Sequence, residues 1–142
     1  MRKAIILLLI LAACTAQAPQ EMDHAMPQGV MKVHASNDTM KLHDYTITFE
    51  RPELTAGKEA KFAVKLMKGD KPLPLQPLHG APMHVIVVSK DLNKFYHLHP
   101  EETAPSALEV HHTFEEPGEY RMWVEYMSDN LEHIIDYDLK VE

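Results

Sequence analysis

Three histidines in two neighbouring stretches of this sequence have the spacing expected of ligands to a metal ion. His97 and His99 are separated by one residue, so both imidazoles point to the same face of an extended strand. His84 lies in the preceding apolar and β-branched stretch 83–89, which is typical of a central strand covered on both faces. Neutral imidazoles are common ligands of zinc and copper. The pattern therefore predicts a metal site formed by these three side chains.

The predicted site depends on how the two stretches pair. They are separated by a short turn and predict an antiparallel hairpin. A register in which Ile86 lies opposite His97 sets His84 across from His99, with Cβ atoms about 4.5–5.5 Å apart. Registers shifted by one residue place His84 on the other face of the hairpin. We favour the first register because it also buries Phe95 against the preceding strand.

Two further donors lie close to these histidines in the sequence. Met83 points to the opposite side of its strand and would join the site only if the backbone is irregular near Pro82. His79, in the loop 78–82, is expected to be mobile enough to fold back as a fourth ligand. In the alternative interpretation, His97 is a core residue and the other histidines are solvated at the surface.

The choice of ion follows from the available donors. Cys14 is the only cysteine, and it lies in a segment that predicts processing, so thiolate-based copper, zinc and iron–sulfur centres are excluded from the domain. The sequence contains ten His and nine Met. Imidazole with thioether nearby favours copper, as Cu(I) or Cu(II), and imidazole alone makes zinc the second candidate.

The elements that must position these residues are short strands. Apolar and polar residues alternate along several stretches, and the turn residues between them recur about every ten positions. No stretch has a convincing amphipathic helical pattern. Residues 41–142 therefore predict an all-β domain, an antiparallel two-sheet sandwich of about seven strands. The predicted strands are centred on residues 45–50, 60–66, 83–89, 95–99, 108–114, 120–126 and 135–141.

The beginning of the chain predicts export. Met1, Arg2 and Lys3 precede the apolar run 4–13, which is about half of the roughly 20 residues needed to span a bilayer. Residues 1–13 are therefore interpreted as a signal peptide. Leu11 to Cys14 resembles a bacterial lipobox, which implies cleavage before Cys14 and lipidation of its thiol. The alternative is an ordinary signal peptide cut near Ala16 or Ala18.

Residues 14–40 predict the lipidated cysteine followed by a flexible tether. The segment is rich in Ala, Gln and Pro and has no apolar periodicity. Met22, His24 and Met26 lie close together in it, so a flexible backbone can bring thioether and imidazole to one soft cation. The alternative is a polar linker in which these residues occur by chance.

Charge excludes one class of function. The formal net charge is -7 at pH 7. A protein that neutralises a phosphate backbone carries clustered Lys and Arg, so no nucleic-acid partner is expected. The length of 142 residues suits a single domain with a tail.

The chain resembles the YtkA-like domain family, small exported or lipid-anchored bacterial modules with an immunoglobulin-like or cupredoxin-like sandwich. The resemblance covers about residues 43–142, and its most specific element is His97-Leu98-His99-Pro100. Family members are described as metal-binding or copper-associated. The resemblance implies a ligand role for His84, His97 and His99. The other matching segments are 53–57, 80–89, 91–92 and 114–124.

These observations predict an exported, lipid-anchored protein of the bacterial cell envelope, periplasmic or at the cell surface. We expect it to bind a metal ion, with copper as the first candidate, and to act as a chaperone, buffer or resistance factor. Its expected partner is an envelope metal-transport or metal-accepting protein with which it exchanges the ion. The alternative is a metal-free immunoglobulin-like adhesion or envelope assembly module. We do not expect an enzyme, because no general base or substrate pocket is recognisable beside the histidines.

Overall fold

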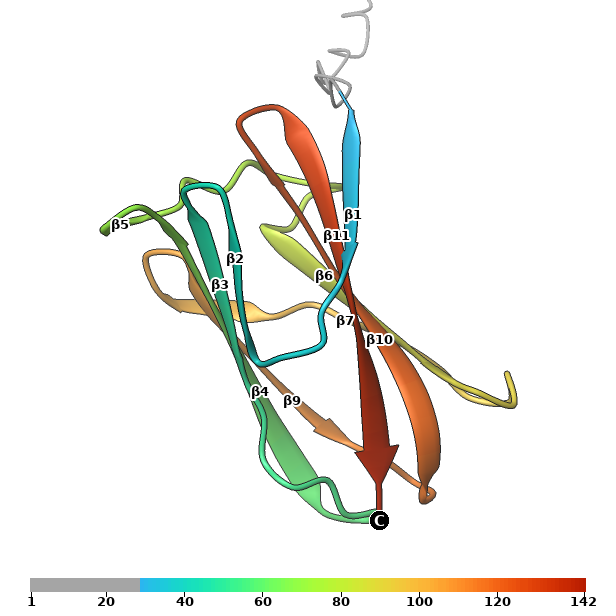
Figure 1. Ribbon diagram of the computed structural model, residues 1–142. Coiled ribbons are helices and arrows are strands. Elements are labelled where there is room, and N and C mark those ends of the chain that lie inside the picture. Colours follow the sequence, from blue (N-terminus) through green and yellow to red (C-terminus); the bar gives the residue numbers. More distant parts are fainter. Residues whose placement is uncertain (1–28) are drawn as a thin grey trace, which may run out of the picture.

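The computed structural model describes residues 29–142, in which two β-sheets pack face to face (Figure 1). Within this part of the chain no helix is long and apolar enough to cross a membrane. The first sheet has five strands, in the order β1 (Val30–His34), β11 (Leu131–Val141), β10 (Gly118–Ser128), β6 (Met83–Ser89) and β7 (Phe95–Leu98).

The second sheet has six strands. Its path is β2 (Thr39–Leu42), β3 (Tyr45–Glu50), β4 (Glu59–Lys68), β9 (Ala107–Thr113) and β8 (Glu101–Ala104), with β5 (Lys71–Pro72) beside β4. Neighbouring strands in this sheet are antiparallel. In the first sheet β1 runs parallel to β11, and the other pairs are antiparallel. The fold class is therefore confirmed as an all-β two-sheet sandwich.

Alternation along the strands places the core between the two sheets. In β4 the side chains of Ala60, Phe62, Val64 and Leu66 are buried, while the lysines between them are exposed. β4 thus contributes every second residue to the core, as its sequence period of two predicts. Aromatic rings fill the centre of the sandwich, where the Phe114 centroid lies 6.2 Å from Phe62 and 5.0 Å from Tyr120.

The folded domain begins earlier than predicted. Residues 30–34 and 39–40 lie in the segment 14–40 that was expected to be a tether, but they form β1 and the first half of β2. In β1, Met31 and Val33 are half-buried and alternate with exposed residues, and the backbone pairs with β11 over the whole strand. Two apolar residues are too short a pattern to reveal a strand, and the pairing partner lies about a hundred residues further along the chain. The predicted signal peptide, Cys14 and the donors Met22, His24 and Met26 lie outside the described residues.

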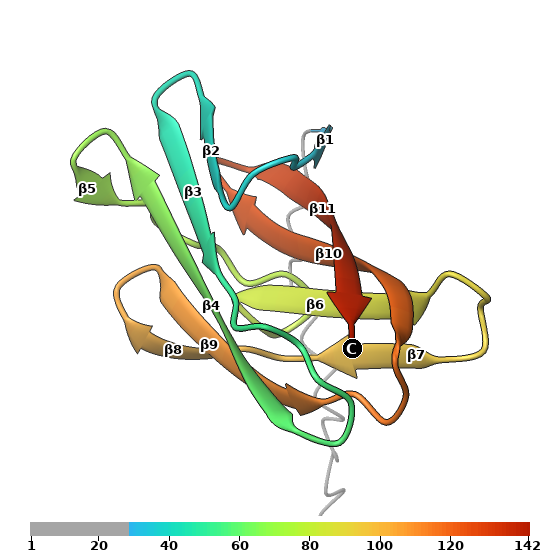
Figure 2. The ribbon, with the colours of Figure 1, turned by 60° about the horizontal axis from the view of Figure 1, so that its bottom comes forward.

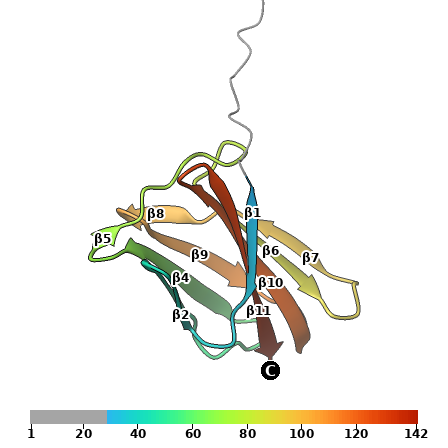
Figure 3. The same cartoon turned by 45° about the horizontal axis from the view of Figure 1, so that its top comes forward.

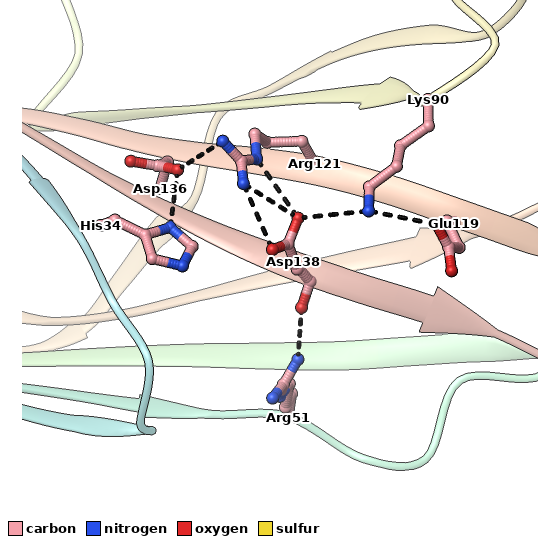
Figure 4. Close-up of polar contacts among 7 residues, drawn as sticks. All are labelled: His34, Arg51, Lys90, Glu119, Arg121, Asp136 and Asp138. Atoms are coloured by element: carbon pink, nitrogen blue, oxygen red, sulfur yellow. Dashed lines mark hydrogen bonds and ion pairs between the residues drawn. The ribbon is translucent and has the colours of Figure 1, made fainter.

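Polar side chains on the outer face of the first sheet hold β1 in place (Figure 4). Asp136 is 4% exposed, and its Oδ2 lies 2.9 Å from His34 Nδ1 and 3.1 Å from Arg121 Nη1. Arg121 also reaches Asp138, at 3.2 Å.

Asp138 has further partners. Lys90 lies 3.8 Å from its carboxylate and 3.1 Å from that of Glu119. Arg51 donates a hydrogen bond to the Asp138 backbone carbonyl at 3.1 Å.

Replacing Arg121 with methionine is expected to destabilise the domain by about 1–3 kcal/mol, because the buried Asp136 carboxylate loses a charged donor. Urea unfolding monitored by tryptophan fluorescence measures this change. Lys140→Met removes the same charge from an exposed pair with Glu142 and is expected to change stability by less than about 0.5 kcal/mol. Equal effects of the two substitutions would contradict the role of Arg121.

Candidate metal centre

The β6–β7 hairpin has the predicted register. Ile86 pairs with His97 and Val88 pairs with Phe95. Figure 2 shows that this hairpin projects from the sandwich and that β7 is an edge strand. Its inward positions are the buried Val85 and Val87 of β6 and the half-buried positions 96 and 98 of β7. His84, Ile86, His97 and His99 therefore belong to the outer face of the five-stranded sheet.

The structure brings together the three predicted ligands, His84, His97 and His99. One nitrogen from each ring lies within 4.8 Å of the nitrogens of the other two. The ring centroids are 5.1 Å apart between His84 and His97, 4.9 Å between His84 and His99, and 4.7 Å between His97 and His99. Among residues 29–142 this is the one group of His, Cys, Asp or Glu side chains close enough to hold a metal ion together.

Hydrogen bonds select the tautomer of His84, which is 4% exposed. Its Nε2 lies 2.8 Å from the Leu78 carbonyl oxygen, which only accepts, so Nε2 carries the proton. Nδ1 then carries the lone pair that faces the cluster, and it accepts a hydrogen bond from His97 Nε2 at 2.9 Å. The Leu78 carbonyl thus fixes the ring with its free nitrogen turned toward the place where an ion would bind.

A tight turn supplies this carbonyl and also holds His79. Leu78 and Ala81 exchange two backbone hydrogen bonds, of 2.8 and 3.1 Å, around His79 and Gly80. Both central residues have positive φ, 48° and 87°, which is the type I′ pattern that glycine tolerates well. The His79 ring centroid is 6.1 Å from that of His84, and its nitrogens are not among the grouped ligand atoms. The expected mobile loop is therefore a hydrogen-bonded turn.

Replacing His79 with asparagine is expected to leave metal affinity within about twofold of the parent, since asparagine tolerates positive φ and keeps the turn. Competition titration with a chromophoric chelator measures this affinity. A tenfold loss would show that His79 moves to the ion.

Two other expectations about the hairpin were wrong. Met83 was considered as a ligand, but its side chain is 0% exposed and belongs to the core, on the face opposite His84. The strand is regular from Met83 onward, so no irregularity turns the thioether outward. Phe95 was expected to be buried against Val88, but it is 65% exposed because both residues lie on the outer face.

The open side of the cluster suits exchange of an ion. His97 and His99 are exposed, whereas His84 is buried. An ion bound tetrahedrally at about 2.0–2.1 Å from each nitrogen separates its ligand atoms by about 3.3 Å. The observed 2.9 Å between His84 and His97 is close to this value, and the two exposed rings are free to adjust. Three imidazoles leave one coordination position for another donor.

Carboxylates border the cluster without joining it. Glu125 of β10 pairs with His84 of β6 in the ladder. A pocket of about 300 Å³ beside His99 is lined by Glu101, Glu109 and His111. Glu102 accepts a hydrogen bond from the Ser106 backbone N–H at 2.9 Å. The negative charge favours the approach of a cation to the cluster.

Two histidines outside the cluster, His133 and His112, pack against aromatic rings of the domain. His133 is 1% exposed and stacks on Tyr126, with centroids 4.7 Å apart and ring planes 2° apart. The His112 ring is 4.3 Å from that of Tyr96. Burial lowers the pKa of both histidines, partly opposed at His112 by the charge of Glu115. The period-two pattern of apolar residues 135–141 extends back to position 133 and is the signal that predicts its burial.

Fold and site together define an all-β sandwich domain with a three-histidine cluster on its outer face. The chain belongs to the family described as "Domain of unknown function (DUF8832)", whose model matches residues 39–142. None of the curated proteins searched matches the chain. The resemblance to YtkA-like domains therefore stays a prediction, with which the sandwich is compatible.

The chain is similar to three solved structures. The soluble domain of PmoD from Methylocystis sp. ATCC 49242 is 14% identical, with a TM-score of 0.51, and the match covers 73% of this chain and 96% of that one. The sulfur carrier protein SoxY from Chlorobium limicola f thiosulfatophilum is 10% identical, with a TM-score of 0.42, over 80% and 84% of the two chains. The CARDB domain of the PF1109 protein from Pyrococcus furiosus, solved with di-metal ions, is 21% identical, with a TM-score of 0.34, over 75% and 95%. At these identities the likeness to PmoD supports the sandwich fold alone.

Proposed function

We propose that this protein binds a metal ion through His84, His97 and His99 and handles copper in the bacterial cell envelope. The observation that carries the proposal is the convergence of three ring nitrogens within 4.8 Å of one another. The buried His84 is held by the Leu78 carbonyl, and the two exposed rings supply the open side. Copper is proposed before zinc because the donors are imidazoles, with thioethers available elsewhere in the chain.

Binding and exchange, rather than catalysis, is the role that we propose. Exposed ligands and an open coordination position let a second protein compete for the ion, as a chaperone, buffer or resistance factor requires. We propose an envelope metal-transport or metal-accepting protein as the partner. The lipobox-like sequence that ends at Cys14 supports export and lipid anchoring, either in the periplasm or at the cell surface. In a metal-free adhesion module the histidines would serve as packing, and the exposure of His97 and His99 disfavours that alternative.

Titration of the proposed mature chain, residues 14–142 with Cys14→Ser, tests metal binding directly. Its imidazole ring protons are followed by NMR as Zn(II) is added. We expect the signals of His84, His97 and His99 to shift and to saturate at one equivalent, while the other histidines stay unchanged. Cu(II), which is paramagnetic, is expected to broaden the same three. A titration in which these three signals do not respond would refute the proposed site.

A further inference from the structure

The outer edge of β7 has backbone groups with which no described strand pairs. β7 is the last strand of its sheet, and β6 separates it from the other strands (Figure 3). The β6–β7 ladder continues by one pair into the turn, where the Ser89 N–H donates to the Lys94 carbonyl at 3.1 Å. Hydrogen-bonded pairs alternate along an antiparallel ladder. Tyr96 therefore bonds to β6, while Phe95 and His97 turn their N–H and C=O groups toward the free edge.

This edge lacks the devices that keep edge strands from pairing with another chain, such as charged side chains, prolines and bulges. β7 consists of Phe, Tyr, His and Leu, and it pairs with β6 without a register shift. The outer strands β1 and β2 carry Lys32 and Lys41, and β8, which is equally short, carries two glutamates and a register shift. Phe95 is 65% exposed. β7 is therefore the described outer strand best suited to accept an added strand.

An added strand would place a side chain beside the histidine cluster. Residues opposite each other in neighbouring strands have Cβ atoms about 4.5–5.5 Å apart and share one face of the sheet. The residue opposite His97 therefore lies on the outer face, next to a cluster in which three imidazoles leave one coordination position open. A methionine or histidine at that position supplies the fourth donor, and both are suitable ligands of copper.

Charge indicates the kind of partner that fits beside this edge. Glu101 and Glu109 line the pocket of about 300 Å³ next to His99. Lys61, which lies 3.2 Å from Glu109, offsets one of the two negative charges. The remaining charge attracts a Lys or Arg that enters with the added strand. A second copy of this chain, with a formal net charge of -7, brings like charges, so a basic segment of a different protein fits better.

Resting on the proposed function, we propose that the metal-exchange partner adds an extended, basic segment to the free edge of β7, with a methionine or histidine opposite His97 as the fourth ligand of the ion. The backbone bonds to Phe95 and His97 give affinity and fix the register. The donor side chain meets the ion only in that register. Docking of the partner and transfer of the ion are thus coupled in one strand pairing.

The probe for this pairing is the synthetic peptide acetyl-Lys-Thr-Val-Met-Val-Thr-Lys-amide, whose palindromic sequence presents the same side chains in either strand direction. It is added to residues 14–142 with Cys14→Ser, loaded anaerobically with one equivalent of Cu(I). One modified peptide carries N-methyl groups on the methionine and one threonine, whose N–H groups would face β7. A matched peptide carries them on the two valines, whose N–H groups would face away.

The dissociation constants are measured by NMR titration, and hydrogen exchange is followed at the Phe95 and His97 amides. We expect the peptide methylated at methionine and threonine to bind at least about tenfold more weakly than the peptide methylated at the valines, because it loses backbone hydrogen bonds to β7. The unmodified peptide and the valine-methylated peptide should protect the two amides from exchange, and the other peptide should not.

A substitution in the protein tests the same edge from the other side. Phe95→Lys adds a charge to the edge strand, and Leu92→Lys adds the same charge to the nearby turn, where Leu92 is 80% exposed. We expect Phe95→Lys to weaken binding of the peptide about tenfold, because a lysine on an edge strand opposes pairing, and Leu92→Lys to match the parent. Equal affinities of the two variants for the peptide would contradict the inference.

The outcomes separate this inference from the proposed function. If the chain binds Cu(I) but the two methylated peptides bind equally well, or no peptide binds, the inference is wrong and the metal site still stands. Protection of the two amides that appears without peptide and increases with protein concentration would assign the edge to a second copy, which also overturns the inference. If the chain itself binds no Cu(I), the proposed function fails first.

Discussion

Replacing His97 and His99 together with alanine is expected to abolish the rise in melting temperature that a bound ion gives the parent chain. An ion present at a hundred times its dissociation constant stabilises the folded state by about 2.7 kcal/mol. For a domain of this size that corresponds to a rise of the order of 10 °C. Removing two of three ligands leaves His84 alone, which cannot hold the ion at that concentration.

The two exposed histidines make this test cleaner than substitution of His84. His84 is buried and bonded to the Leu78 carbonyl, so its loss changes the metal-free fold as well as the site. The double variant without metal is expected to stay within about 1 kcal/mol of the parent. A matched control replaces two exposed histidines outside the cluster, with His43→Asn, which keeps the positive φ of 55°, and His111→Ala. A control that loses the metal-dependent rise as completely as the double variant would contradict the assignment.

The hairpin shows what sequence periodicity can and cannot predict. Side chains alternate between the two faces of a strand, so a shift of one residue in the register would turn His84 away from His97 and His99. The requirement that the three histidines share one face therefore predicts the register. The supporting reason was nevertheless wrong, because Phe95 is exposed on the same outer face as the histidines. Periodicity groups residues by face, but a hairpin considered alone does not show which face the second sheet will cover. The outer-face position of the cluster therefore emerged only from the packing of the two sheets.

Other parts of the site depend on local geometry that leaves little trace in the sequence. The turn around His79 places a histidine at positive φ, where glycine or asparagine is the usual signal. That turn supplies the carbonyl that orients His84. The parallel pairing of β1 with β11 joins segments about a hundred residues apart, and pairing at such separation is not encoded in a local pattern. The long alternating strands β4 and β11, in contrast, were predictable from apolar residues at every second position.

Replacing His133 with phenylalanine is expected to stabilise the metal-free domain by about 1–3 kcal/mol at neutral pH. Neither ring nitrogen of His133 makes a hydrogen bond of good geometry among residues 29–142. Its ring is 1% exposed, stacks on Tyr126 and lies 5.8 Å from Tyr45. Phenylalanine keeps an aromatic ring at this position and removes two buried polar atoms that make no hydrogen bond of good geometry.

The same substitution is expected to reduce the sensitivity of the domain to acid. Burial lowers the pKa of His133 below the usual value of about 6.5 for a histidine, while the Ser128 backbone and the charge of Asp129 oppose this shift in part. The unfolded chain therefore takes up a proton at a pH where the folded chain does not. The stability that comes from keeping the ring neutral is fully present above about pH 6.5, and it is lost as the pH falls below that value, with a slope of at most about 1.4 kcal/mol per pH unit.

Urea unfolding at pH 7.5 and pH 5, with a chelator present to exclude metal, measures both effects. The parent is expected to lose more stability between these two values than His133→Phe does. Some pH dependence should remain in the variant, because burial also lowers the pKa of His112. His111→Phe, which replaces an exposed histidine on β9, serves as the control and should keep the slope of the parent. If His133→Phe loses as much stability on acidification as the parent, the neutral buried imidazole is not a source of the acid sensitivity.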